Sequence, residues 1–184
     1  MARKRFKWNS EKVLSLTAMA MSFITLIIFI QQTRIMSRQN YLSILPYLDI
    51  STTRDQEKSL FELNLKNHGV GPAIIESVVL AYKGKQFNLA DYDHYMFKFL
   101  LEQIPELDSL KGISSSSLDI GMAIPANTSY NVLRVKDSPK DYELLDNVIE
   151  RLLEEGFEYE IIYKSIQNER WKIYNNSEGP KPLR

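Results

Sequence analysis

The fold is decided by residues 13–30, VLSLTAMAMSFITLIIFI, eighteen residues without a charged side chain. As a helix with about 1.5 Å rise per residue, this stretch is about 27 Å long, and the uncharged Gln31, Gln32 and Thr33 extend it to roughly 31 Å. The hydrocarbon core of a bilayer has this thickness. Ten of the eighteen residues are Leu, Ile, Val or Phe, whose insertion into lipid is favourable. The pattern predicts a transmembrane helix over residues 13–33.

A cleaved signal peptide and a buried core helix are the alternative interpretations of this stretch. The apolar region of a signal peptide is about 7 to 15 residues long and ends at a small-residue cleavage site, whereas this run is longer and is followed by Gln31 and Gln32. A core helix is expected to have a polar face, but the polar residues here are four small hydroxyls. We therefore expect an uncleaved anchor.

Charge is distributed unevenly along the chain. Residues 1–40 carry seven Lys or Arg and one acidic residue, and residues 41–184 carry sixteen Lys or Arg and twenty-two Asp or Glu. The basic residues before the apolar stretch are Arg3, Lys4, Arg5, Lys7 and Lys12, against two in residues 31–50. Because positive charge tends to stay in the cytoplasm, we expect residues 41–184 to be extracytoplasmic. A nucleic-acid or partner patch is the alternative reading of the basic cluster.

The chain is divided by its composition into five segments. We expect a basic N-terminal segment over residues 1–12, the transmembrane helix over 13–33, a helical stalk over 34–42, a β-rich domain over 43–174 and a tail over 175–184. The 140 or so residues after the anchor are the size of one domain. An acidic domain without a basic stripe is not expected to bind nucleic acid, and the absence of cysteine excludes disulfides and thiolate metal sites.

The domain shows strand patterns and two helix patterns. Alternating or branched apolar residues predict strands at residues 41–53, 61–66, 74–82, 85–87, 118–124, 129–135, 157–163 and 170–174. One helix is expected over residues 88–104, with Asn88 or Asp91 as its cap. A second helix is expected to be capped by Ser138, to begin at Pro139 and to stop at Gly156. The fold class is therefore a β-rich domain with two inserted helices.

Residues 67–73, NHGVGPA, predict a tight loop between two strands. Gly69 and Gly71 permit positive φ, Asn67 can bond its own backbone, and Pro72 cannot donate to a ladder. The pair of glycines lacks the third glycine and the strand-to-helix setting of a dinucleotide site. We therefore interpret the loop as a structural turn and not as a ligand cradle.

A resemblance to known proteins rests on two stretches shortly after the predicted membrane anchor: PYLDI (residues 46–50) and FELNLKNHGVGPAII (residues 61–75). They resemble a group of uncharacterised bacterial single-pass membrane proteins with an N-x-G-x-G-P-A loop, over about residues 41–82. The resemblance implies an outer domain of the immunoglobulin-like β-sandwich type. It implies no activity, and no catalytic residue is carried over from it.

The sequence offers few parts for catalysis. His68 and His94 are isolated histidines, and a metal cluster of Asp91, Asp93 and His94 is disfavoured because neighbouring residues on a helix diverge by about 100°. The paired carboxylates Glu154 and Glu155 are expected on a solvated helix face. We expect no enzyme, no metal and no cofactor.

A membrane-anchored binding or scaffolding protein with a protein partner of unknown identity is the function that we expect. The alternatives are an accessory subunit of a bacterial envelope stress or phage-defence system and a hydrolase using carboxylates such as Asp91, Asp93 or Glu102. Small residues at Ala18 and Ser22 belong to a helical stripe where two copies of the chain could approach closely. A homo-oligomer through Ala18 and Ser22 is therefore a further expectation.

Overall fold

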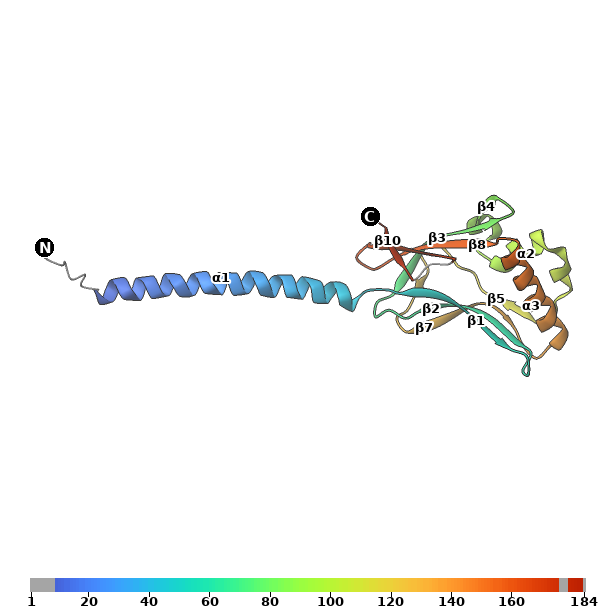
Figure 1. The fold of residues 1–184 in the computed structure, drawn as a ribbon, viewed down its shortest axis with the longest axis horizontal. Coiled ribbons are helices and arrows are strands. Elements are labelled where there is room, and N and C mark those ends of the chain that lie inside the picture. The colour runs from blue at the N-terminus through green and yellow to red at the C-terminus, as the bar shows by residue number, and fades with distance from the viewer. Residues whose placement is uncertain (1–8, 176–178, 184) are drawn as a thin grey trace. The chain divides into compact units, whose positions relative to one another are not determined.

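The structure is a computed structural model that describes residues 9–175 and 179–183. Its contacts divide the chain into two units, Met1–Leu42 and Ser43–Arg184 (Figure 1). Each unit is described by itself. Four basic residues on which the predicted orientation depends, Arg3, Lys4, Arg5 and Lys7, lie outside the described residues.

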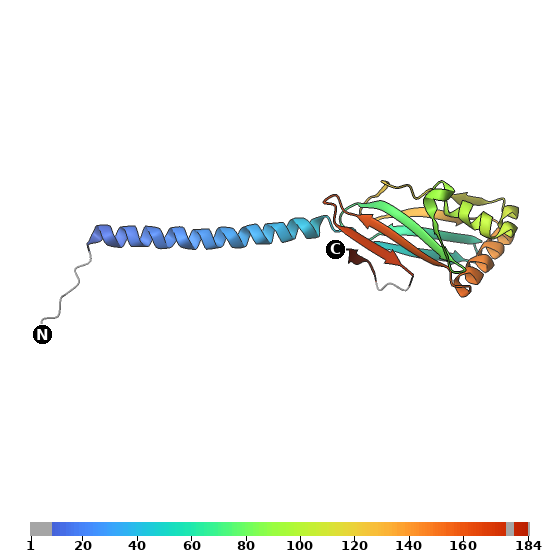
Figure 2. The same ribbon diagram turned by 90° about the horizontal axis from the view of Figure 1, so that it is seen from above.

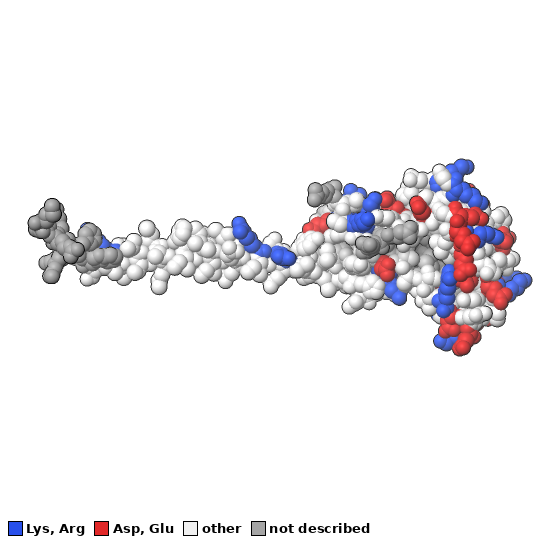
Figure 3. Space-filling model, viewed as in Figure 1, with Lys and Arg blue, Asp and Glu red and all other residues white. Residues whose placement is uncertain are grey.

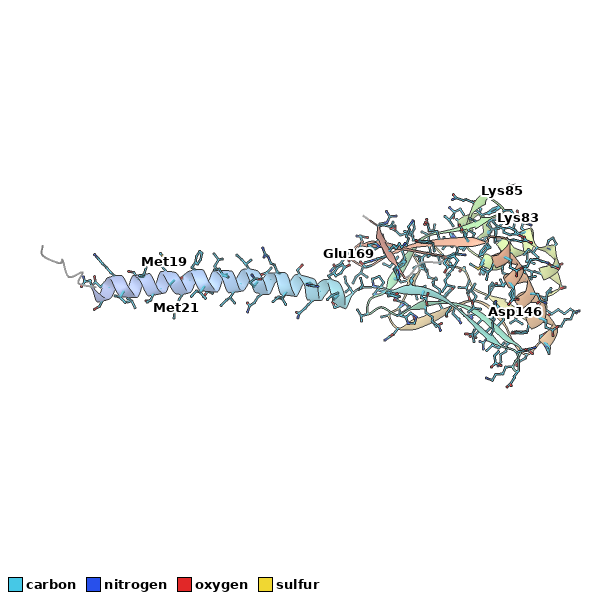
Figure 4. All side chains as sticks on the ribbon, in the orientation of Figure 1. Met19, Met21, Lys83, Lys85, Asp146 and Glu169 are labelled. Atoms are coloured by element: carbon cyan, nitrogen blue, oxygen red, sulfur yellow. The ribbon has the colours of Figure 1, made fainter. Side chains whose placement is uncertain are left out.

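The first unit is formed by helix α1, Ser10–Ser43, which contains Lys12 and has no buried residue. Its length and composition suffice to cross a membrane. Its hydroxyls bond back to the helix, since the Ser22 Oγ donates to the Ala18 carbonyl at 2.9 Å. Apolar side chains project all round, and Met19 and Met21 point to opposite sides (Figure 4). Residues 34–42, the expected stalk, are helical, because α1 continues without a break beyond the apolar stretch.

The second unit is built on two antiparallel sheets (Figure 2). The first sheet has the strand order β1-β2-β7-β5: β1 (Leu48–Asp55), β2 (Leu60–Asn67), β7 (Thr128–Val135) and β5 (Ile113–Ser115). The second sheet has the order β10-β9-β8-β3-β4: β10 (Lys181–Leu183), β9 (Arg170–Tyr174), β8 (Glu158–Lys164), β3 (Ala73–Tyr82) and β4 (Lys85–Asn88). The short β6 (Ala123–Ile124) also pairs with β3.

One hydrophobic core is shared by the two sheets. Phe61 and Leu65 enter it from the first sheet, and Ile75, Leu80 and Tyr163 enter it from the second. The sheets are also joined by a hydrogen bond, because the Leu48 N–H donates to the Tyr163 hydroxyl at 3.3 Å. Trp171 is buried and stacks on Tyr163, with ring centres 5.9 Å apart. The β-rich class predicted from the sequence is thus confirmed.

The clearest predicted helix is confirmed as α3, Pro139–Glu154. The Ser138 side chain caps it by accepting from the Asp141 N–H, and Gly156 ends it with φ +80°, a conformation that few other residues adopt. The strands predicted at residues 74–82 and 85–87 pair as β3 and β4, and those predicted at residues 157–163 and 170–174 pair as β8 and β9.

The first predicted helix, over residues 88–104, is wrong in its middle. The segment begins with the 3-10 helix η1, Leu89–Tyr92, which Asn88 caps. Asp93 and His94 then adopt positive φ, 51° and 64°, and Tyr95 forms a β-bridge with Ser117. Helix α2, Met96–Gln103, starts only after this break, and a second 3-10 helix η2, Pro105–Ser109, follows it.

Two strand predictions and the predicted tail also need correction. The first strand begins at Leu48 and not at residue 41, because α1 extends to Ser43. Of residues 118–124 only Ala123 and Ile124 form a strand, and this strand pairs with β3 of the second sheet. The expected tail over residues 175–184 contains β10, which pairs with β9.

Candidate functional site

A hollow of about 460 Å³ lies on the face of the second sheet that is turned away from the core. Its floor is formed by Val79 and Ala81, the half-buried residues of β3 that alternate with core residues. In the register of the sheet, Ala81 lies between Gln86 on β4 and Glu158 on β8. Small side chains in the central strand and longer ones on its neighbours therefore produce the depression.

The wall of the hollow is formed by charged and aromatic side chains of β8 and β9. Glu160, which pairs with Val79, lies opposite Tyr174. The Lys172 Nζ lies 3.1 Å from the Glu160 Oε2 and 5.6 Å from the centre of the Tyr174 ring. Lys181 approaches the same ring, with its Nζ 4.9 Å from the centre. Two ammonium groups thus lie near the Tyr174 ring, where attraction to the ring stabilises them, and the Lys181 Nζ also donates to the Tyr174 hydroxyl.

The rim of the hollow is fixed by Asn175. Its Oδ1 accepts a hydrogen bond from the Tyr159 N–H at 2.7 Å, and its Nδ2 donates to the Phe157 carbonyl at 2.8 Å, so the side chain extends the ladder between β8 and β9. Burial, and then the charge of Asp49, raises the pKa of the Tyr159 hydroxyl. The Tyr159 side chain packs against the hydrophobic core, since Tyr159 opposes the buried Leu80 in the sheet.

The chemistry offered by the hollow is that of recognition. The carboxylates of Glu158 and Glu160 accept hydrogen bonds, Gln86 can donate and accept, and the Tyr174 ring provides an apolar face. Among the described residues, Glu158 has no ion-pair partner, so its charge is available to a ligand. Such a surface fits a polar partner that carries hydrogen-bond donors.

The predicted loop between β2 and β3 is organised by the Asn67 side chain, which is buried. Its Oδ1 accepts from the N–H groups of Tyr47 and Gly69, at 3.1 and 2.9 Å. Its Nδ2 donates to the carbonyls of Gly71 and Ile124, at 2.8 and 3.0 Å. One amide therefore links the segment before β1, its own loop and β6, using both its acceptor and its donor capacity.

Gly69 and Gly71 were expected to adopt positive φ, but neither does. They are needed because a side chain does not fit at either position. A Cβ added to Gly69 lies 2.3 Å from the Leu45 carbonyl oxygen, and one added to Gly71 lies 2.0 Å from that of Ile44. The backbone before β1 thus occupies the space of both side chains. The neighbouring Pro72 is half-buried and lies between the loop and β3.

The candidate acids and histidines from the sequence are dispersed over the domain. Asp93 pairs with Lys98, and the exposed His68 lies with its ring 6.4 Å from that of Tyr47. The Glu155 carboxylate accepts from the Tyr82 hydroxyl and lies 3.3 Å from the Lys83 Nζ. Lys83 and Lys85, at the β3–β4 turn, are labelled in Figure 4. Within residues 9–175 and 179–183, no group of three or more His, Cys, Asp or Glu is arranged to hold a metal ion.

The hollow on the second sheet was missed from the sequence because it depends on a pairing between strands far apart in the chain. Alternation in β3 and β8 predicts which side chains point away from the core, but not that Ala81 lies beside Glu158.

Comparison of the sequence with protein-family models and with curated proteins found no match.

Proposed function

We propose that this chain is a single-pass membrane protein whose immunoglobulin-like outer domain binds a partner protein. The observation that carries the anchoring is the surface of α1. None of its residues is buried, and on the face drawn in Figure 3 Lys and Arg lie only to either side of the apolar stretch and not within it. A helix that is apolar on all sides requires an apolar environment, and lipid provides it along the required length.

The orientation follows from the basic residues that flank the apolar stretch. Five of them precede it and two follow it within residues 31–50, so the N-terminus is cytoplasmic and the domain is extracytoplasmic in this proposal. The two antiparallel sheets around a common core support the immunoglobulin-like type.

Binding by the domain is supported by the hollow on the second sheet. Its floor is apolar, and hydrogen-bonding groups and an aromatic ring surround it, as in many recognition sites. The polar lining residues are carboxylates, amides, tyrosines and a lysine, which suit contact with a partner and lack the pairing of a nucleophile with a base. We therefore favour recognition over hydrolysis.

Anchoring is tested by washing membranes with sodium carbonate, which should leave the full chain in the pellet. Release into the supernatant contradicts the transmembrane proposal. The orientation is tested with reporters fused after Arg184: alkaline phosphatase should be active and a cytoplasmic fluorophore dark. The opposite pattern places the domain in the cytoplasm.

Binding through the hollow is tested with Ala81→Arg, which fills the floor with a long charged side chain. Thr53→Arg is the matched control, because Thr53 is a half-buried strand residue of the other sheet, opposite Glu62. Partners cross-linked in intact membranes should be lost with Ala81→Arg and retained with Thr53→Arg. Equal capture by both variants refutes the assignment of the binding face.

A further inference from the structure

Helix α1 carries a stripe of large apolar residues that repeats every seven positions. Its members, called the seven-residue stripe below, are Leu14, Met21, Ile28, Ile35 and Leu42. Positions seven apart drift by only about 20° on a straight helix. Because α1 is continuous from Ser10 to Ser43, the stripe extends from the first turn of the helix to the last.

A second set of residues lies beside the stripe at the alternate spacing of a heptad. Ala18, Thr25, Gln32 and Gln39 each precede a stripe residue by three positions. Small residues allow helices to approach closely, and amide side chains hydrogen-bond between helices. The side chains of Gln32 and Gln39 have no hydrogen bond within the described chain. An amide both donates and accepts, so the same amide at the same height on a second copy is a complementary partner.

The end of the stripe lies where lipid does not cover it. The 34 residues of α1 are about 51 Å long, whereas the hydrocarbon core is about 30 Å thick. Leu42 lies nine residues beyond Thr33, the end of the predicted span, which is about 14 Å along the helix. The side chains of Ile35 and Leu42 are 56% and 51% exposed, and the exposure of such large apolar side chains to water is unfavourable. A second protein helix can cover both side chains, and the bilayer cannot cover Leu42.

The charges of α1 permit two copies to pair along the stripe. Arg34 is one position before Ile35 and so lies about 100° away from it, and Lys12 is two positions before Leu14, about 200° away. Arg38 lies at the margin of the seam, where the facing position of a parallel copy is Ser43. Two helices of this length in contact over a width of about 10 Å cover roughly 1,000 Å² in total, the lower limit of a specific interface.

We propose that α1 pairs in parallel with α1 of a second copy of this chain along the seven-residue stripe, as a left-handed two-helix coil in which the amides of Gln32 and Gln39 bond across the seam. The inference rests in part on the proposed membrane anchoring, which aligns the two copies. The contact expected from the sequence was centred on Ala18 and Ser22. In the contact along the seven-residue stripe, Ala18 still faces the second copy, whereas Ser22 lies at the edge of the contact.

Disulfide scanning tests the proposal directly, because the chain has no cysteine of its own. Single variants Ile35→Cys, Gln39→Cys and Leu42→Cys are compared with Arg34→Cys, Ser37→Cys and Tyr41→Cys, in the full chain in native membranes under mild oxidation. A disulfide needs Cβ atoms about 4 Å apart, so the first three should cross-link roughly ten times faster than the controls. Equal rates at all six positions, or no cross-link in membrane-embedded protein, overturn the proposal.

A second variant separates the amides from the apolar contacts. Gln32→Leu should weaken association roughly fivefold, since an interhelical hydrogen bond in a membrane contributes about 1 kcal/mol, while Thr33→Leu should leave it unchanged. Unchanged association with Gln32→Leu overturns the role of the amide. Carbonate washing of the same membranes tests the anchoring separately. Cross-linking at Gln39→Cys and Leu42→Cys is measured before any wash, so its result does not depend on whether carbonate releases the protein.

Discussion

Replacement of Gly71 by Ala tests the close packing of the loop between β2 and β3 against the backbone before β1. The added Cβ lies 2.0 Å from the Ile44 carbonyl oxygen and 2.3 Å from its carbonyl carbon, whereas ordinary contact begins at 3.4 Å. One of the two backbone segments has to move by more than an ångström. The variant is therefore expected to disturb the hydrogen bonds that join these segments.

The magnitude of the loss follows from these contacts. Overpacking of this kind costs about 1–3 kcal/mol. The Val70 N–H bond to the Leu45 carbonyl, 3.0 Å long, and the Asn67 bond to the Gly71 carbonyl, 2.8 Å long, are each worth about 1 kcal/mol. A loss of about 3 kcal/mol corresponds to a fall in Tm of about 10 °C for a domain of roughly 140 residues.

The assay is thermal unfolding of the full chain in detergent, followed by the emission of the buried Trp171. Gly84→Ala is the matched control, because Gly84 has φ +75° and no atom within 4 Å of an added Cβ, so only the backbone strain of about 1 kcal/mol applies. Asn tolerates that conformation. Gly84→Asn should therefore be milder than Gly84→Ala, while Gly71→Asn should be no better than Gly71→Ala.

The reasoning is refuted if Gly71→Ala is as stable as Gly84→Ala, or if Asn at position 71 restores the wild-type Tm. Either result means that the loop accommodates a side chain without displacing the backbone of Ile44. The glycine is then required for some property other than close approach.

Three further predictions concern buried polar groups. Asn67→Leu leaves four hydrogen-bonding groups unpaired and should lower the free energy of unfolding by about 3 kcal/mol in chemical denaturation. Burial raises the pKa of the Asp141 carboxyl, but the hydrogen bonds that it accepts lower it, the strongest from the Gly112 N–H. The net result is a lowered pKa. The ionised carboxylate thus stabilises the fold above about pH 4, and this contribution is lost as pH falls through the lowered pKa, so the Tm deficit of Asp141→Asn should shrink in acid. Tyr163→Phe removes the acceptor of the Leu48 N–H and should cost about 1 kcal/mol in the same denaturation assay.

Each of the three has an outcome that contradicts it. Wild-type stability of Asn67→Leu shows that water replaces the amide. A Tm deficit of Asp141→Asn that stays constant between neutral and acid pH shows that the carboxylate is not stabilised in its charged form. An unchanged free energy of unfolding for Tyr163→Phe means that the hydrogen bond from the Leu48 N–H contributes nothing to stability.

Local chemistry explains which parts of the fold could be predicted. Helix α3 follows from Ser138, Pro139 and Gly156, which act on their immediate neighbours, and the β3–β4 turn follows from Lys83 and Gly84 in the same way. The break at Asp93 and His94 is different, because the bridge between Tyr95 and Ser117 that accompanies it joins residues 22 positions apart. No local pattern reveals such a partner.

The candidate site and the loop were predictable to different degrees. Asn67 and the two glycines were recognised from the sequence, but the backbone that excludes a Cβ at Gly69 and Gly71 belongs to residues 44–47, whose position depends on the whole domain. Similarly, the outward direction of Val79 and Ala81 follows from alternation, whereas the hollow requires β8 to lie beside β3.

The place of β3 in the second sheet determines when that sheet can form during synthesis. One edge of β3 pairs with β4 almost at once, as Tyr82 opposes Lys85, but its other edge pairs with β8, where Ile75 opposes Tyr163. At about 5–20 residues per second, the intervening 80 or so residues take the ribosome roughly 4–16 s. Throughout that interval the nascent chain exposes an unpaired strand edge of the kind that promotes aggregation. Folding yield should consequently be sensitive to translation speed between residues 83 and 157, and β3 is the segment that a chaperone has to shield.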